Sequence, residues 1–405
     1  MSVGSVPLAQ RAAGPDLARG AALLGIGLAN TVGWLHGDRW TVLLKQTHTS
    51  AADRTVDVLV ALLADNRGFP LFALLFGYGI GIMHRRSLAA GERPGRFALR
   101  MLRRFTVLGA IGMLHAVLLF SGDILVSYAV IGTACALLAT RGRLALLLAA
   151  MVCLAPLGLW GWVDATIALG GGDGYASAAA GSWGEGVSLR AHEALRSLAF
   201  APVEQIGLLA PMALGAAAAS LRMLELPREN ADLLRPLARW GLLVGLVGAV
   251  PLTAVLVLDP GQEVLGDEVV LGTLGVLHQV SGLAGAVGAA ALCALLADRW
   301  GRGGRSRALT ALTALGATAL SAYVAQSLAA SLLFPPYTLD LGARLGSAGA
   351  SAIMALTWLV TLLAAAAWRR TGRRGPLEAV LRRLAGSAAP AGARRSAEAS
   401  SVGPR

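Results

Sequence analysis

The feature that most constrains this chain is a series of apolar runs of about 20 residues, separated by polar segments. A run of that length crosses the hydrocarbon core of a bilayer as one α-helix. Only 14% of the residues are charged and the mean hydropathy is +0.64, so the composition is not that of a soluble domain. Lipid offers the backbone no hydrogen-bond partners, so spanning helices must pack as a bundle. We predict an all-α, polytopic transmembrane helix bundle of about ten spans, near residues 17–35, 69–83, 105–120, 124–140, 144–163, 202–221, 240–258, 269–297, 308–334 and 346–368.

The distribution of basic residues indicates the orientation of these spans. With both termini in the cytoplasm, about four-fifths of the Lys and Arg residues fall in cytoplasmic segments, as the positive-inside rule requires. The arginine-rich segment 84–104 is the strongest cytoplasmic marker, whereas 164–199 lies outside in this arrangement. We therefore predict a multi-pass protein of the cell membrane with N-in and C-in topology.

The net charge of +12 does not indicate a nucleic-acid partner, because the basic residues occupy short loops between apolar runs. Basic loops on the cytoplasmic face attract anionic headgroups. The predicted partners are membrane lipids and a small-molecule or lipid-linked substrate, with no nucleic acid.

The chain is predicted to hold one membrane domain, residues 1–385, followed by a disordered cytoplasmic tail at 386–405, which is rich in Arg, Ala, Ser and Gly. Residues 55–64 are predicted to form an interfacial helix or the outer part of a hairpin. The Gly-, Ala- and Ser-rich segment 164–199 is predicted to be a loop, with a flexible linker at its GGGDG stretch.

Two local patterns predict particular contacts. Gly77 and Gly81 form a GxxxG pair, which lets two helices approach closely. Pro376 is predicted to open a short amphipathic helix on the inner surface, because proline suits the first helical turn.

The cysteines give no sign of a metal site. Cys135, Cys153 and Cys293 fall within predicted spans and show no metal-ligand spacing, so they are predicted to be small apolar core residues. With no nucleotide-binding motif either, we predict neither a metal nor a cofactor.

The hairpin 103–132 carries the sharpest functional candidates, because ionisable groups at membrane depth are costly. His115 lies inside its first apolar run, where it can shuttle a proton or act as a general base, or simply hydrogen-bond between helices. Asp123 lies at the turn, where it can carry a functional charge or cap the following helix. Arg67 can pair with Asp123, bind an external anion, or serve as an interfacial cation.

A repeated spacing suggests a shared pocket. Arg104 and His115 are eleven residues apart, close to three helical turns, and so are Arg19 and Asn30. We predict that spans 17–35 and 105–120 pack together, with His115 and Asn30 facing one pocket and the arginines below. Alternatively, both arginines anchor helix starts by snorkelling.

Further polar residues lie in two later spans. His278 and Gln279 form a pair at depth, and Tyr323, Gln326 and Ser327 fall on one broad helical face. These residues can line a cavity or hydrogen-bond between helices.

Five stretches together resemble the YeiB-like membrane proteins, a family of unknown function numbered 418. They are DLARGAALLGIGLAN at 16–30, RGFPLFALLFGYG at 67–79, the hairpin RR…LH…SGDIL…YA at 103–132, LSAYVAQS at 320–327 and RGPLE at 374–378. The resemblance implies a multi-pass membrane protein that is often described as transport-related. The first stretch is also distantly similar to integral-membrane acyltransferases, which tend to carry a histidine where this chain has Asn30.

Three classes of function follow from these patterns. The first is a transporter-like protein that moves a small molecule or lipid-linked group through a polar intramembrane pocket. The second is a membrane-embedded acyltransferase that modifies a lipid, glycan or small molecule with His115 as general base, and the third is a non-catalytic partner in an envelope pathway. The predicted binding residues are Arg19, Asn30, Arg67, Arg104, Asp123, His278, Tyr323 and Gln326.

Overall fold

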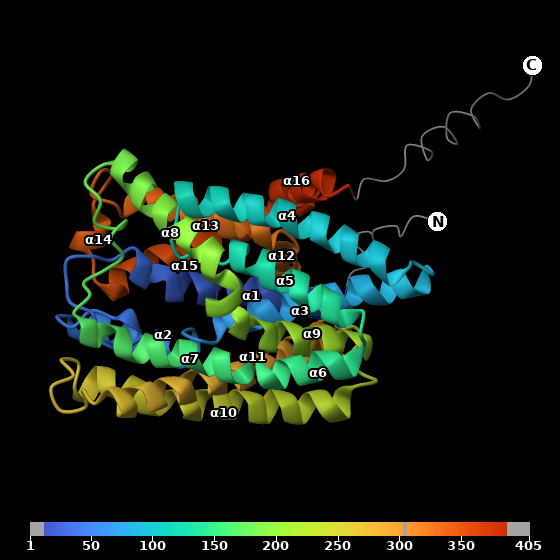
Figure 1. The fold of residues 1–405 in the computed structure, drawn as a ribbon, viewed down its shortest axis with the longest axis horizontal. Helices are drawn as coiled ribbons and strands as arrows, with labels where there is room; N and C mark the ends of the chain where they lie inside the picture. The colour runs from blue at the N-terminus through green and yellow to red at the C-terminus, as the bar shows by residue number, and fades with distance from the viewer. Residues whose placement is uncertain (1–11, 303–305, 387–405) are drawn as a thin grey trace, which may run out of the picture.

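The structure, a computed structural model, describes residues 12–302 and 306–386. Those residues form helices and no strand, with two isolated β-bridges between loop residues (Figure 1). The predicted all-α class is confirmed, whereas the predicted tail lies outside the described residues beyond 386. The helices are α1 Ala13–Ala29, α2 Ala51–Leu63, α3 Gly68–Ala89, α4 Pro94–Leu118, α5 Leu125–Ala139, α6 Arg143–Val152, α7 Leu154–Thr166, α8 Trp183–Glu204, α9 Leu209–Ser220, α10 Ala231–Leu258, α11 Glu268–Arg302, α12 Arg307–Ala317, α13 Ala319–Leu333, α14 Leu341–Arg344, α15 Ser347–Arg369 and α16 Pro376–Leu384, with 3₁₀ turns η2 Asn30–Gly33, η3 Val42–Leu44, η4 Ile167–Gly170 and η5 Ile206–Leu208.

Several of these helices are suited to a membrane. Within the described residues, 6 helical segments are long and apolar enough to cross a bilayer, or up to 8 if each of two bent pairs counts as one span. This confirms a bundle of membrane-spanning character. The finer count of about ten spans and the N-in, C-in orientation stay predictions.

Two predicted segments differ from the structure. The span predicted at 308–334 is broken at Thr318, where α12 and α13 meet at a bend of 85° because Thr318 leaves helical geometry. The loop predicted at 164–199 contains α8, whose first turn is capped by the Ser182 side chain accepting from the Glu185 N–H. Gly and Ala in the segment concealed this helix, which bends by 57° into η5 and α9.

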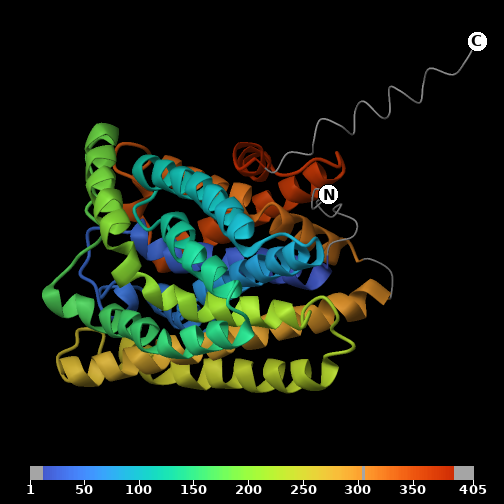
Figure 2. The same ribbon diagram turned by 45° about the vertical axis from the view of Figure 1, so that its right-hand side comes forward.

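Helix α1 lies inside the bundle, packed against α3, α11, α12 and α15 (Figures 1 and 2). Helices α10 and α11 lie along one edge, while α4, α8 and α16 lie toward the opposite edge. Because other helices occupy the faces of α1, and α4 packs on α5, α8 and α16, these two helices do not form a packed pair. The predicted direct packing of spans 17–35 and 105–120 is therefore wrong.

The GxxxG prediction is confirmed. A Cβ on Gly77 would stand 1.8 Å from the Met212 carbonyl oxygen, and one on Gly81 would stand 2.6 Å from that of Ala216. Only glycine lets α3 and α9 approach this closely.

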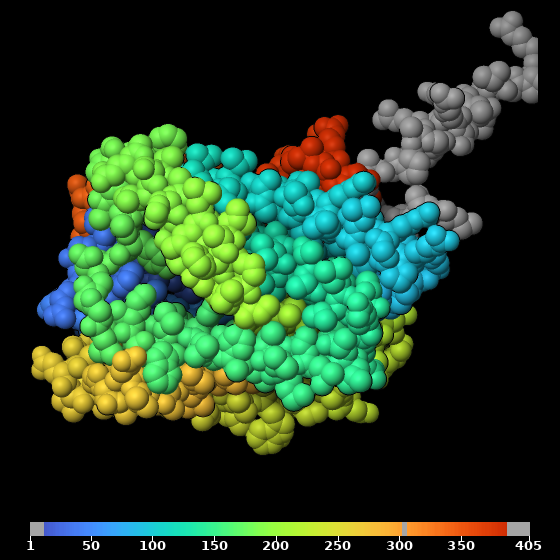
Figure 3. Space-filling model, viewed as in Figure 1, coloured from blue at the N-terminus to red at the C-terminus, as the bar shows by residue number. Residues whose placement is uncertain are grey.

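The predictions for the cysteines and for Pro376 can also be compared with the structure. Cys135 and Cys153 are buried and Cys293 is partly buried, all as free thiols. Pro376 opens α16 as predicted, and Leu381 is the buried residue of that helix. The molecular surface is hollowed between α7 and α8, where segments near the N-terminus are visible (Figure 3).

Candidate functional site

A cavity of about 1270 Å³ opens into the bundle and brings together segments that are distant in the sequence. Its walls come from α1, α3, α4, α5, α11, α12, α13, α15 and α16 and from the segment that precedes α16. Ala12 and Gly386, at the two ends of the described chain, both line it, so these ends lie at the same end of the bundle.

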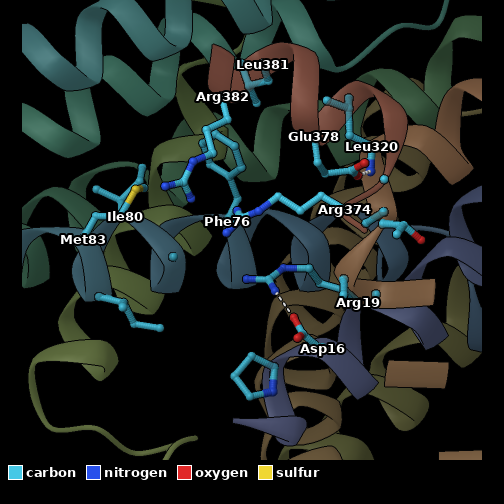
Figure 4. A pocket seen from close by; sticks show the side chains of 18 of the residues that line it. Asp16, Arg19, Phe76, Ile80, Met83, Leu320, Arg374, Glu378, Leu381 and Arg382 are labelled. Carbon is cyan, nitrogen blue, oxygen red and sulfur yellow. Dashed lines mark hydrogen bonds and ion pairs between the residues drawn. The ribbon is translucent and has the colours of Figure 1, made fainter. Parts of the chain in front are cut away.

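One part of the cavity is strongly basic. Figure 4 shows Arg19, Arg374 and Arg382 extending toward the same space from α1, the segment after α15, and α16. The cavity is lined by more arginines than carboxylates. The arginines are Arg19, Arg86, Arg96, Arg100, Arg104, Arg369, Arg373, Arg374 and Arg382. The carboxylates are those of Asp16, Glu92, Glu225 and Glu378.

Three of the four carboxylates are held in ion pairs. Asp16 pairs with Arg19 at 2.7 Å and Glu92 pairs with Arg100 at 2.6 Å, while Glu225 pairs with Arg85. Glu378 is bound differently, because its carboxylate accepts hydrogen bonds from the first turn of α13. Among the described residues that line the cavity, arginines therefore outnumber carboxylates, which makes its wall basic.

The rest of the wall is apolar and aromatic. The residues Phe72, Phe76, Ile80, Met83, Phe105, Leu108 and Tyr128 line it. The rings of Phe76, Phe105 and Tyr128 pack in sequence, with centroids 5.5 and 5.1 Å from that of Phe76. The cavity thus has an arginine-rich region next to an apolar one. This combination suits a ligand with an anionic group attached to an apolar body.

His115 and Asp123 form a buried pair behind the cavity wall. His115 Nδ1 lies 2.8 Å from Asp123 Oδ1, and the two side chains are only 1% and 2% exposed. Asp123 Oδ2 accepts the Val126 N–H at 3.0 Å, in the first turn of α5. Asp123 therefore binds the first turn of α5 through one oxygen and His115 through the other, so the capping alternative is found, while a functional charge on Asp123 stays a prediction.

The arrangement fixes which nitrogen of His115 is available. When the Asp123 carboxyl is ionised it only accepts hydrogen bonds, and His115 Nδ1 then carries the proton that it accepts. Nε2 has no hydrogen-bond partner among the described residues, although it is buried. A histidine oriented in this way can take up a proton at Nε2.

Tyr323 connects this pair to the cavity. Its ring packs against His115, with centroids 4.9 Å apart, and it also lines the cavity. Gln326, one turn further along α13, is 3% exposed, and its Oε1 faces Gly27 of α1. The predicted polar face of this span therefore points inward.

The predicted shared pocket is only partly found. Arg19 and Arg104 do line one cavity, as the spacing suggested. Asn30 is instead the C-cap of α1, and neither it nor His115 is among the residues lining the cavity. Since α1 and α4 are not neighbours, equal depth along the two helices does not bring Asn30 to His115.

A second polar cluster surrounds Arg67 and His278. Arg67 donates to the carbonyl oxygens of Asp65 and Gly245, each at 2.6 Å, and its Nη1 lies 3.3 Å from His278 Nε2. The alternative in which Arg67 pairs with Asp123 is not found, because these contacts hold Arg67 between the α2–α3 turn, α10 and α11.

Charged residues that the sequence analysis did not select complete this cluster. Asn66 donates to Asp164 at 3.1 Å and lies 3.3 Å from His278 Nδ1. Lys45 pairs with Asp65 at 2.9 Å, with the lysine side chain 1% exposed. The sequence shows only that these polar residues lie beside apolar runs. Their contact with one another depends on the tertiary packing and could not be predicted from the sequence.

The resembling stretches converge on the cavity. Arg19, from the first stretch, donates to the Leu75 carbonyl oxygen of the second at 3.1 Å. Tyr323, from the fourth, packs on His115 of the third. Glu378, from the fifth, accepts from the Leu320 N–H of the fourth at 2.8 Å. Residues of all five stretches line the one cavity.

The fold and this site define a helical membrane protein with an arginine-lined cavity beside a buried His–Asp pair. Residues 218–387 match the family described as "Protein of unknown function (DUF418)". The resemblance to family 418 expected from the sequence is thereby confirmed.

Two relatives also match part of the chain. One is "Uncharacterized protein YxaH" of Bacillus subtilis (strain 168), 30% identical over 122 residues, which cover 29% of this chain and 30% of that protein. The other is "Uncharacterized 39.9 kDa protein in amylase 3'region" of Bacillus acidopullulyticus, 33% identical over 127 residues, covering 31% and 34%. The matched segment thus spans about a third of either relative. No solved structure matches the chain.

Proposed function

We propose that this chain is a transporter-like protein of the cell membrane, with about ten spans and both termini in the cytoplasm. It would take an anionic small molecule or lipid-linked group into the arginine-lined cavity from the cytoplasmic side. The observation that carries this proposal is the convergence of five distant stretches on one basic, partly aromatic cavity.

The electrostatics of the cavity support an anionic ligand. A cleft lined by charge of one sign, within low-dielectric walls, concentrates counter-ions. Charged side chains inside membrane bundles usually face substrate paths, because they are too costly to hold against lipid. The break between α12 and α13 at Thr318 adds a half-helix N-terminus at the wall, a device that transporters use to hold anionic groups.

The His115–Asp123 pair supplies a proton-handling group behind the same wall. The Asp123 carboxylate lies 2.8 Å from His115 Nδ1 and orients the imidazole, and the Tyr323 ring packs between the imidazole and the cavity. In this proposal, a proton taken up at Nε2 accompanies the movement of the anion.

Binding and coupling can be tested separately. Hexyl phosphate combines an anionic group with a short apolar tail, so calorimetry on the protein in nanodiscs should detect its binding. Arg104→Ala should weaken that binding, whereas His115→Ala should leave it intact. In proteoliposomes containing a pH-sensitive dye, hexyl phosphate should drive a proton flux that His115→Ala abolishes. Absence of hexyl phosphate binding to the wild-type protein would overturn the proposal.

A second candidate, acyl transfer, is favoured by one observation. Asp123 holds Nδ1, and Nε2 has no partner in the part of the chain that the structure describes, which is the arrangement of a general base. His115 Nε2 would accept the proton of an attacking hydroxyl as its oxygen bonds to the acyl carbon. The carbon–sulfur bond of the thioester donor would then break, and the thiolate would take the proton from Nε2 and leave as the free thiol. Thiol release from acetyl-CoA or palmitoyl-CoA that depends on both an acceptor and His115 would favour this function over transport.

A further inference from the structure

A second hollow, of about 340 Å³, lies apart from the arginine-lined cavity and shares no lining residue with it. Its walls come from α1, the end of α2, the start of α3, α10 and α11. Helices α10 and α11 lie along one edge of the bundle (Figures 1 and 2), and the lining residues Leu63, Leu242 and Leu246 are exposed. This lateral groove therefore opens sideways, onto the apolar surface that a spanning bundle presents to lipid.

Four glycines make the lateral groove narrow. Helix α1 approaches the start of α3 where a Cβ on Gly68 would stand 3.1 Å from the carbonyl carbon of Gly25. Helix α10 approaches α11 where a Cβ on Gly245 would stand 2.7 Å from the Cα of Gly285. All four glycines line the groove. Its volume is near the lower end of the roughly 300–1,000 Å³ of ligand pockets, so it suits a single chain better than a two-chain lipid.

The lateral groove lies at a break in a candidate membrane span. Residues Ala51–Ala89 are long and apolar enough to cross a bilayer, but the helix is interrupted between Leu63 and Gly68, where Asn66 has a φ of +56°. Irregular backbone at membrane depth is tolerated where it lines a cavity, and transporters place binding sites at such breaks. Arg67, the last residue of the break, lines the groove.

Arg67 brings a positive charge to a groove whose other lining residues are alanine, glycine and leucine. Its side chain belongs to a residue that is 8% exposed, and among the described residues no carboxylate lies within ion-pair distance of it. Asp65, the acidic group within electrostatic range, is held by Lys45 at 2.9 Å. A buried charge without an ion partner is costly, and within membrane spans such groups mark ligand paths.

One donor of this guanidinium is directed at the groove. Arg67 Nη2 donates to the Gly245 carbonyl oxygen at 2.6 Å, and Arg67 Cγ lies 3.6 Å from the position of a Cβ on Gly285. Nε lies between these two contacts, and its N–H points to the same side of the planar guanidinium as one N–H of Nη2. In the part of the chain that the structure describes, Nε has no hydrogen-bond partner. An oxygen of a ligand in the groove can therefore accept from it.

We propose that the lateral groove binds a long-chain fatty acid, with the carboxylate at Arg67 and the hydrocarbon chain between α1, α10 and α11. A guanidinium fork matches a carboxylate, and the remaining wall matches a hydrocarbon chain. Gly245 lies halfway along the 28-residue α10, so Arg67 meets its ligand deep within a span. A carboxyl group is compact and loses its charge on protonation, so it reaches that depth more readily than a phospholipid headgroup.

Binding is tested with a palmitate analogue that carries a diazirine in its chain, added to the full chain in phosphatidylcholine nanodiscs and illuminated. The labelled peptides should come from α1, α10 or α11, and oleate should suppress their labelling. Methyl oleate lacks the negative charge, so it should compete about tenfold more weakly than oleate. Phosphatidylglycerol at the same mole fraction should not compete. Equal competition by oleate and either of these two lipids would overturn the assignment, because the groove would then take any acyl chain.

Substitutions test the location of the site. Ala21 lines the groove at an exposed position of α1, so Ala21→Trp should fill the groove, leave Arg67 in place and abolish the labelling that oleate suppresses. Val247→Trp is the matched control, because Val247 is exposed on α10 and does not line the groove. Unchanged labelling in Ala21→Trp, or an equal loss in Val247→Trp, would refute the site.

The role of the arginine is tested by Arg67→Gln, which should remove the preference for oleate over methyl oleate. A retained preference in the folded variant would refute the contact with the carboxylate. Arg67 also binds backbone oxygens of two segments, so Ala21→Trp decides the question if Arg67→Gln does not fold. Ala21→Trp should still bind hexyl phosphate, because the groove and the arginine-lined cavity share no residue. The fatty-acid site and the proposed function can therefore fail independently.

Discussion

Substitution of Asp123 separates the structural and chemical roles of one carboxylate. One oxygen accepts the Val126 N–H and caps α5, while the other accepts from His115. Asparagine retains an oxygen for the cap, and asparagine and aspartate cap helices about equally well. It cannot accept at both positions, however, because its second group is an NH₂ donor.

Because of these two contacts, Asp123→Ala and Asp123→Asn should lower the free energy of unfolding by different amounts. Asp123→Ala loses the cap, at roughly 0.5–2 kcal/mol, and leaves the buried Nδ1–H of His115 unpaired, at roughly 1–3 kcal/mol. Together these losses should lower the free energy of unfolding by roughly 1.5–5 kcal/mol. Asp123→Asn should cost no more than about 1 kcal/mol, because the cap remains and the amide NH₂ donates to Nδ1.

That donation changes the chemistry of the histidine. If Nδ1 accepts a hydrogen bond from the amide, the single proton of the neutral imidazole lies on Nε2. Nε2 then cannot accept another proton. Asp123→Asn should therefore fold nearly as well as the wild type while losing the proton flux driven by hexyl phosphate.

Two measurements test this reasoning: unfolding of the purified protein by SDS in mixed micelles, and the flux assay. Asp267 is a matched control, because its carboxylate caps α11 by accepting the Val270 N–H at 2.9 Å, at an exposed site. Asp267→Ala should lower stability less than Asp123→Ala and leave the flux unchanged. Wild-type flux in Asp123→Asn would refute the role of the carboxylate, and a loss of stability equal to that of Asp123→Ala would refute the cap.

Three further outcomes follow from other parts of the structure. A cysteine placed at Ser306 should react with a membrane-impermeant reagent only in inverted vesicles, and labelling in intact cells would overturn the orientation. Gly77→Ala should disrupt the α3–α9 contact and lower the melting temperature, whereas Gly184→Ala, with open space around its Cβ position, should have little effect or stabilise α8. The Arg100 hydrogen bond lowers the pKa of the Glu92 carboxyl. A depressed carboxyl pKa contributes stability that is present above the ordinary carboxyl range and lost as the pH falls through the folded-state pKa. The difference in stability between the wild type and Glu92→Gln should therefore be present at neutral pH and vanish on acidification, and a pH-independent difference would contradict this attribution.

Local sequence patterns predicted most of the architecture. Apolar runs of bilayer length predicted the helical membrane class, and the GxxxG spacing predicted the close contact made by Gly77 and Gly81. Pro376 at the start of α16 was predicted in the same way. Each of these features depends on helical periodicity or on neighbours along the chain, and both are visible in one sequence. His115 and Asp123 were selected separately as candidates in one hairpin, and their pairing across a short turn was not predicted.

Long-range packing decided what these patterns could not. The prediction that Asn30 faces His115 assumed that two helices of equal direction are neighbours, but α3, α11, α12 and α15 occupy the faces of α1. The hold of Glu378 on α13, at a separation of 57 and 58 residues, and the pairing of Lys45 with Asp65 leave no local signature. A buried charge is stabilised by whichever partner the fold brings within hydrogen-bond distance, and that partner is chosen by the packing of whole helices rather than by spacing along the chain.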